Sequence, residues 1–128
     1  PQHILAWARK KGIGDHYFLF TDRSNEFEIV GRNLLTSDGH CSYSPDRRWI
    51  LTDTYPDNEH MRRLLLYNPE KKRLVEVGKF YSNPELRGEI RCDLHPRWNR
   101  YGNQVCIDST HERSRQMYII DVEKIVRE

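Results

Sequence analysis

The sequence has few features that mark a metal–thiolate cluster, a membrane span or a nucleic-acid surface. Its three cysteines, Cys41, Cys92 and Cys106, form no CxxC pair, which argues against a thiolate cluster or a disulfide framework and favours buried thiols. No apolar run approaches the roughly 20 residues that cross a bilayer. The 21 basic residues nearly balance the 19 acidic ones, whereas nucleic-acid binders normally carry a basic stripe. We therefore expect neither a membrane nor a nucleic acid as partner.

Signatures of several enzyme classes are missing as well. There is no P-loop, no GxGxxG and no GxSxG, the patterns that mark phosphate loops, dinucleotide sites and nucleophile elbows. The sequence shows neither a signal peptide nor an initiator Met, as we expect for a piece of a longer protein. The compartment therefore stays open between cytoplasm and periplasm.

Aromatic residues are plentiful, with three Trp, seven Tyr and four Phe in 128 residues. Aromatic and β-branched residues favour strands, and this length is typical of one domain. An internal repeat organises the expected strands. Residues 17–31 can be laid on 64–78 at an offset of 47, and residues 43–54 on 98–109 at an offset of 55. The offsets differ because insertions are tolerated in turns.

Each repeat unit is expected to carry four short strands, with units at about 1–33, 38–80 and 92–128. The middle unit is complete, with strands expected at 40–44, 48–54, 62–68 and 73–78. The first unit shows the last three strands, at 3–7, 16–21 and 26–31. The third shows the first three, at 94–99, 103–109 and 115–121. The final residues form either one or two helical turns or a linker.

Four antiparallel strands at this period are typical of a β-propeller blade. A single four-stranded sheet has two apolar faces, and radial stacking of blades covers both. The sequence therefore predicts an all-β, partial propeller of about two and a half blades, whereas natural rings have at least four. We expect either a fragment of a ring of roughly seven blades or an assembly of several copies. Open strand edges would drive self-association of the isolated piece.

Two segments carry a family resemblance. "SYSPDRRWILTD" (42–53) and "RWNRYGNQVCIDS" (97–109) resemble the repeat element of TolB-like and WD40-like propellers. The longer pattern "DGHCSYSPDRRWILTDTYP…GEIRCDLHPRW…QMYIIDV" resembles the propellers grouped with the oligogalacturonate lyases, over nearly the whole chain. The resemblance implies a metal-assisted lyase that cleaves acidic oligosaccharides by β-elimination, using a divalent cation, manganese, held by His and Gln side chains. The alternative is a non-catalytic propeller that binds a protein or a carbohydrate.

The candidate metal ligands are two histidines at matching places in the repeat. Asp38-Gly39-His40 and Asp93-Leu94-His95 both precede the first strand of a unit, 55 residues apart. In a propeller both would face one funnel, where His40 and His95 could share a divalent cation. Asp38 and Asp93 would then be ligands or acceptors that fix the imidazole tautomer. Alternatively, Asp-x-His merely satisfies backbone groups at a blade corner. The Gln and the closely spaced His pair of the family site are absent around His95.

Three further residues are candidates for substrate binding. Arg91 and Arg97 could hold a sugar carboxylate, because guanidinium groups bind carboxylates bidentately; the alternative is pairing with nearby acidic residues. His111 lies in a loop expected at the same mouth, where a solvated loop is the alternative. The base that abstracts the proton would be a His or Arg of the funnel, and no single residue is singled out. Asp53 and Asp108 share a repeat position, which favours a structural turn role.

Overall fold

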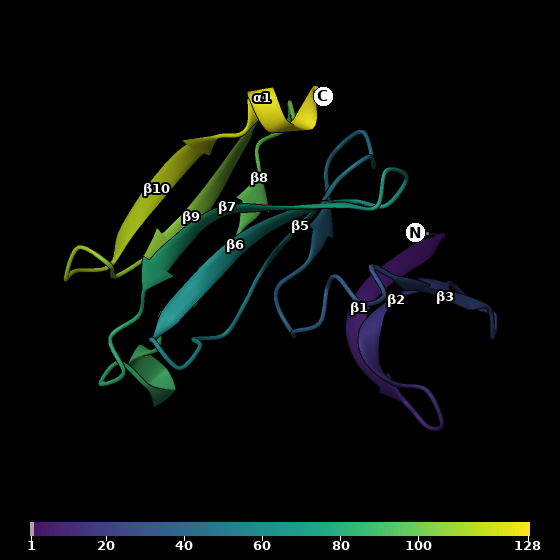
Figure 1. Cartoon of the computed structure of the whole chain (residues 1–128), viewed down its shortest axis with the longest axis horizontal. Coiled ribbons are helices and arrows are strands. Elements are labelled where there is room, and N and C mark those ends of the chain that lie inside the picture. The colour runs from purple at the N-terminus through teal and green to yellow at the C-terminus, as the bar shows by residue number, and fades with distance from the viewer. Residues whose placement is uncertain (1) are drawn as a thin grey trace.

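The computed structural model describes residues 2–128, and nearly all of its regular structure is β-strand. The strands form three separate antiparallel sheets that follow one another along the chain (Figure 1). Each repeat unit predicted from the sequence contributes one sheet. The prediction of an all-β fold is therefore confirmed.

The first sheet has the order β1-β2-β3. Its strands are β1 (His3–Lys10), β2 (Gly14–Thr21) and β3 (Phe27–Val30). β1 runs beyond the predicted 3–7 because it pairs with β2 along its whole length, until Lys10 lies opposite Gly14. Gly12 and Gly14 close this hairpin with φ angles of +81° and +104°, conformations that glycine adopts without a steric penalty.

The middle sheet has four strands in the order β4-β5-β6-β7. They are β4 (Ser42–Tyr43), β5 (Ile50–Asp53), β6 (Met61–Asn68) and β7 (Arg73–Tyr81). β7 continues past the predicted end at residue 78, because a register shift at Leu64/Leu65 of β6 lets the two strands stay paired up to Met61 and Tyr81. Bulges of this kind bend a strand without ending the ladder.

The third sheet has the order β10-β9-β8. Its strands are β8 (Arg97–Trp98), β9 (Gln104–Ser109) and β10 (Gln116–Asp121). A short 3-10 turn, η1 (Gly88–Ile90), precedes this sheet, and one helical turn, α1 (Glu123–Val126), follows it. The indole Nε1 of Trp49 donates to the carbonyl of Val126 at 3.1 Å, which fastens α1 to the middle sheet.

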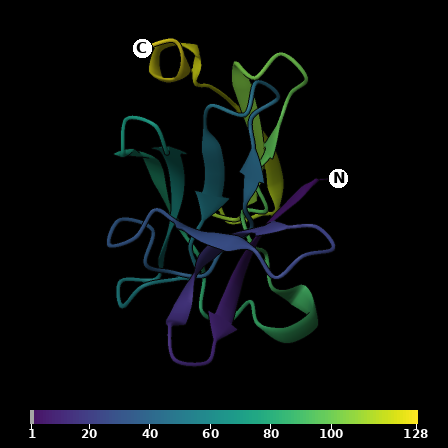
Figure 2. The same cartoon turned by 90° about the vertical axis from the view of Figure 1, so that its right-hand side faces the viewer.

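Two hydrophobic clusters pack the middle sheet against the first sheet on one face and against the third sheet on the other. Seen from the side of the first sheet, β1 to β3 lie in front of the middle sheet (Figure 2). Alternate residues of a strand point to opposite faces, so adjacent residues of β5 serve different cores. Ile50 packs with Tyr17 and Tyr67 towards the first sheet. Leu51 packs with a second cluster towards the third sheet, made of Trp49, Leu64, Leu66, Leu94, Val105, Ile107 and Val122. No helix within residues 2–128 has the length and apolarity of a membrane span.

Candidate functional site

One buried carboxylate joins the two segments that precede β4 and β8. Asp53, the last residue of β5, is 2 % exposed. Its Oδ1 accepts the backbone N–H of His40 at 2.7 Å, and its Oδ2 accepts the backbone N–H of His95 at 3.1 Å. Hydrogen bonds to an ionised acceptor are stronger than neutral ones. A single side chain therefore fixes both Asp-x-His segments, and we call the group of Asp53, His40 and His95 the histidine corner.

The two imidazoles of the histidine corner lie face to face. Their ring centroids are 4.4 Å apart and their planes differ by 30°. The Nδ1 atom of His40 lies 3.1 Å from each carboxylate oxygen of Asp53, so Nδ1 carries the proton that the carboxylate accepts. In the neutral imidazole this leaves the lone pair on Nε2, the carboxylate–imidazole arrangement common behind metal ligands. The side chain of His40 is 33 % exposed, and His95 is exposed.

Local sequence explains why the chain can pack so closely here. A Cβ atom at Gly39 would lie 1.9 Å from the carbonyl oxygen of Asp53, so this position needs glycine. Leu94 is 1 % exposed and anchors the second segment in the core. Its carbonyl accepts the N–H of Asp108 at 2.9 Å. His95, two residues before β8, adopts a left-handed backbone conformation with a φ of +44°.

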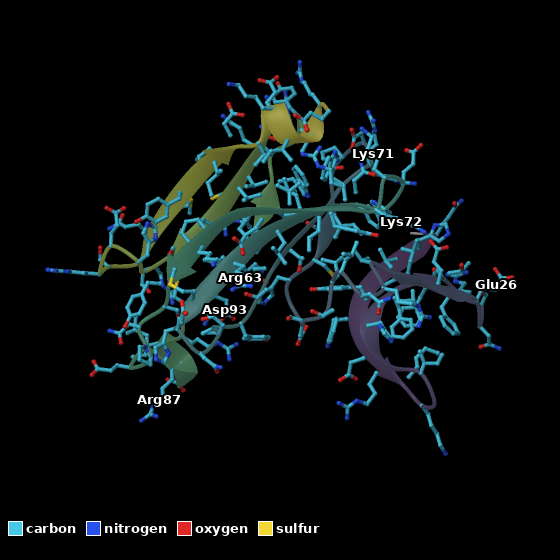
Figure 3. The ribbon with its side chains drawn as sticks, viewed as in Figure 1. Glu26, Arg63, Lys71, Lys72, Arg87 and Asp93 are labelled. Carbon is cyan, nitrogen blue, oxygen red and sulfur yellow. The ribbon has the colours of Figure 1, made fainter. Side chains whose placement is uncertain are left out.

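Neither Asp38 nor Asp93, the aspartates of the two Asp-x-His segments, contacts the imidazole of His40. Asp38 is exposed. Asp93 lies beside β6 (Figure 3), where its Oδ1 is 2.7 Å from Nη1 of Arg62 and its Oδ2 is 3.0 Å from Nη2 of Arg91. The role of orienting His40, expected of Asp38, is filled in this structure by Asp53.

The two candidate substrate-binding arginines both have acidic partners. The guanidinium of Arg97 lies 3.1 and 3.2 Å from the two carboxylate oxygens of Asp108, and it also donates to the carbonyl of His95 at 2.9 Å. The hydrogen bond to Asp108 raises the pKa of Arg97 and outweighs partial burial, which acts to lower it. Arg91 pairs with Asp93 and lies 5.5 Å from the ring centroid of Tyr55. Arg97 thus adjoins the histidine corner directly.

His111 belongs to a different cluster. Its Nδ1 lies 2.7 Å from the hydroxyl of Ser109, and its ring lies 4.6 Å from that of Tyr118 and 5.2 Å from that of Phe80. The hydroxyl of Tyr118 donates to Glu112 at 2.7 Å, a bond that raises the pKa of Tyr118. The structure therefore packs His111 among aromatic side chains instead of against His40 or His95.

The histidine corner brings together two imidazoles, which are its candidate cation ligands. Within residues 2–128 there is no cluster of three or more His, Cys, Asp or Glu side chains placed to hold a metal ion. Two imidazoles with a carboxylate behind His40 match the donor chemistry of zinc more closely than that of manganese, which favours oxygen ligands. The remaining coordination positions would be filled by water or by groups of another chain or segment.

Asp53 is the corner residue that sequence reasoning did not assign to the site. Its repeat position matches that of Asp108, which suggests a turn role for both, yet only Asp53 contacts two segments. The available signal is an acidic residue at the end of the apolar strand "WILTD", because a carboxylate in such a place is buried and requires partners.

Comparisons with protein-family models and with curated proteins give no match to this chain.

Proposed function

We propose that this chain is part of a TolB-like β-propeller that acts as a metal-assisted lyase on acidic oligosaccharides such as oligogalacturonides. Support for the propeller comes from three antiparallel sheets of one repeat, each packed face to face on the next. In such an arrangement the segments before β4 and β8 start neighbouring blades.

The observation that carries the proposal is the pair of imidazoles at the histidine corner. His40 and His95 come from consecutive repeat units, stack at 4.4 Å and are both held by Asp53. The additional contact of Asp53 with Nδ1 of His40 presets the tautomer in which Nε2 can bind a cation.

In this proposal His40 and His95 hold a divalent cation, manganese by family resemblance. A bound cation supplies Lewis-acid neutralisation of the uronate carboxylate, which acidifies the adjacent C5–H. Asp53 keeps His40 oriented. Arg97, beside His95, and Arg91 supply guanidinium groups that could exchange an acidic partner for the substrate carboxylate.

A second candidate function is non-catalytic binding of a protein or carbohydrate. It is favoured by the pairing of Arg97 with Asp108 and of Arg91 with Asp93, which leaves the guanidinium charges balanced. The two-imidazole donor set also falls short of a complete protein cage.

The reaction is tested by incubating metal-replete protein with oligogalacturonate and following the ultraviolet absorbance of the unsaturated product. The lyase proposal expects the absorbance to rise, and expects His40→Ala and His95→Ala to slow the rise by about tenfold or more. His60→Ala, in the exposed β5–β6 loop, is the matched control and should leave the rate unchanged. If no absorbance develops although manganese still binds, the binding function is favoured.

A further inference from the structure

The outer faces of the first and third sheets are apolar and uncovered. On the third sheet Met117 and Ile119 of β10 are 68 % and 63 % exposed, and Ile119 lies opposite Cys106 of β9. On the first sheet Ile4 and Phe27 are 46 % and 37 % exposed. Exposed apolar patches of this kind mark interaction surfaces.

The outer face of the third sheet, which we call the trailing face, consists of Cys106, Met117 and Ile119. The repeat aligns these three positions with residues of the middle sheet, namely Leu51, Leu64 and Leu66. All three leucines are 0 % exposed and pack in the core between the middle and third sheets. The trailing face is therefore equivalent to the surface through which the middle sheet packs on the third sheet.

The outer face of the first sheet, which we call the leading face, consists of Ile4, Phe18, Phe20 and Phe27. Phe18 is 0 % exposed because its ring packs against those of Phe20 and Phe27, so Ile4, Phe20 and Phe27 form the accessible part of the face. The repeat aligns all four positions with Ile50, Leu65, Tyr67 and Leu74 of the middle sheet. Those four residues all pack in the core between the first and middle sheets. The leading face is thus equivalent to the surface through which the middle sheet meets the sheet before it.

Both internal interfaces join the same two kinds of face. At each one, a surface equivalent to the trailing face of one sheet meets a surface equivalent to the leading face of the next. The chain presents one unused copy of each, at opposite ends of its row of sheets (Figure 1). Within residues 2–128, neither face belongs to the two hydrophobic clusters that lie between the sheets.

We propose that the leading face of one copy of this chain packs on the trailing face of a second copy, head to tail. The contact continues the internal stacking and buries Phe20 of β2 and Phe27 of β3 against β10 of the neighbour. It is a heterologous contact, because the two surfaces differ, and such contacts form rings or open chains. It is independent of any cation at the histidine corner.

Disulfide trapping between mixed variants tests the pairing of faces. In a background lacking Cys41, Cys92 and Cys106, Ile4→Cys and Met117→Cys are made in separate chains. Their repeat equivalents, Ile50 and Tyr17, belong to one buried cluster. On oxidation we expect the mixture to give a cross-linked dimer at least about ten times faster than either variant alone.

Equal rates in the mixture and in the single variants would overturn the proposal, because they would indicate unselective contact. A matched control pairs Ile4→Cys with Tyr101→Cys, which is 74 % exposed in the β8–β9 turn and lies outside both faces; it should cross-link only slowly.

The mass in solution gives a second readout that does not depend on engineered thiols. Light scattering should find species of at least twice the 15.4 kDa chain mass, and Met117→Glu with Ile119→Glu should return the protein to the monomer. Both side chains are exposed, so the far-ultraviolet circular dichroism of this variant should be unchanged. A wild-type chain that stays monomeric at high concentration would overturn the proposal and leave the two faces to other partners.

Discussion

At the scale of single residues, Asp53 is the residue that holds the histidine corner together, because it accepts hydrogen bonds from both segments. A buried carboxylate is costly unless it is well supplied with donors. Asp53 has the N–H groups of His40 and His95 and the imidazole of His40. Asp108, at the same repeat position, is only partly buried and pairs with Arg97 at the surface. Substituting each aspartate in turn therefore compares a buried carboxylate with a surface carboxylate at the same repeat position.

Asp53→Ala should lower the free energy of unfolding by about 3 kcal/mol, because it leaves two N–H groups without their charged acceptor in a buried place. Asp108→Ala removes a surface ion pair and should cost less than about 1 kcal/mol. Urea unfolding curves for the two variants measure both values. Equal losses would show that Asp53 does not hold the corner.

Cys41 should be an unreactive thiol. Burial raises the pKa of its thiol to about 11, so the neutral form persists well above neutral pH. At pH 8 roughly one thiol in a thousand would be the reactive thiolate. In a chain with Cys92 and Cys106 replaced by alanine, alkylation by iodoacetamide should be at least about 100 times slower than that of free cysteine. The rate should climb about tenfold per pH unit towards pH 10; a rate near that of free cysteine at pH 8 would contradict this.

At the scale of elements, the sequence predicts the strands better than it predicts their ends. Alternating apolar segments and turn residues are local signals, so all ten strands lie where the repeat places them. β4 and β8 are shorter than 40–44 and 94–99 because His40 and His95 give their N–H groups to Asp53 instead of to a ladder. That competition depends on a side chain distant in sequence, which no local pattern reveals.

A buried arginine links the middle sheet to the segment that precedes the third sheet. Arg62 of β6 is 3 % exposed, donates through Nε to Ser82 at 3.0 Å and lies 2.7 Å from Asp93, which precedes β8. Arg91 contacts the same carboxylate from the surface, with 48 % of its side chain exposed. Asp93 therefore has one buried and one exposed partner.

Arg62→Ala should cost about 3 kcal/mol of unfolding free energy, since it leaves Asp93 largely buried without its main partner. Arg91→Ala should cost less than about 1 kcal/mol. Thermal or urea unfolding of the two variants measures the difference. If Arg91→Ala were the more damaging change, the link between the sheets would run through the surface pair.

At the scale of the whole molecule, the repeat explains both the order of the sheets and the meeting of the histidines. The equivalence of His40 and His95 is visible in the sequence because it rests on matching motifs. Their stacking at 4.4 Å depends on how one sheet packs on the next, and the partners of Arg91, Arg97 and His111 depend on the same packing. Local sequence does not encode these contacts, so the pair could be predicted while its surroundings could not.

The central claim is that His40 and His95 together bind a divalent cation. The most direct test is titration of the protein with Mn²⁺, following the electron paramagnetic resonance signal of the free ion. We predict that the wild type and His60→Ala take up one Mn²⁺ with equal affinity, and that His40→Ala and His95→Ala each bind at least about ten times more weakly. Equal binding by all four proteins, or binding by none, would contradict the account.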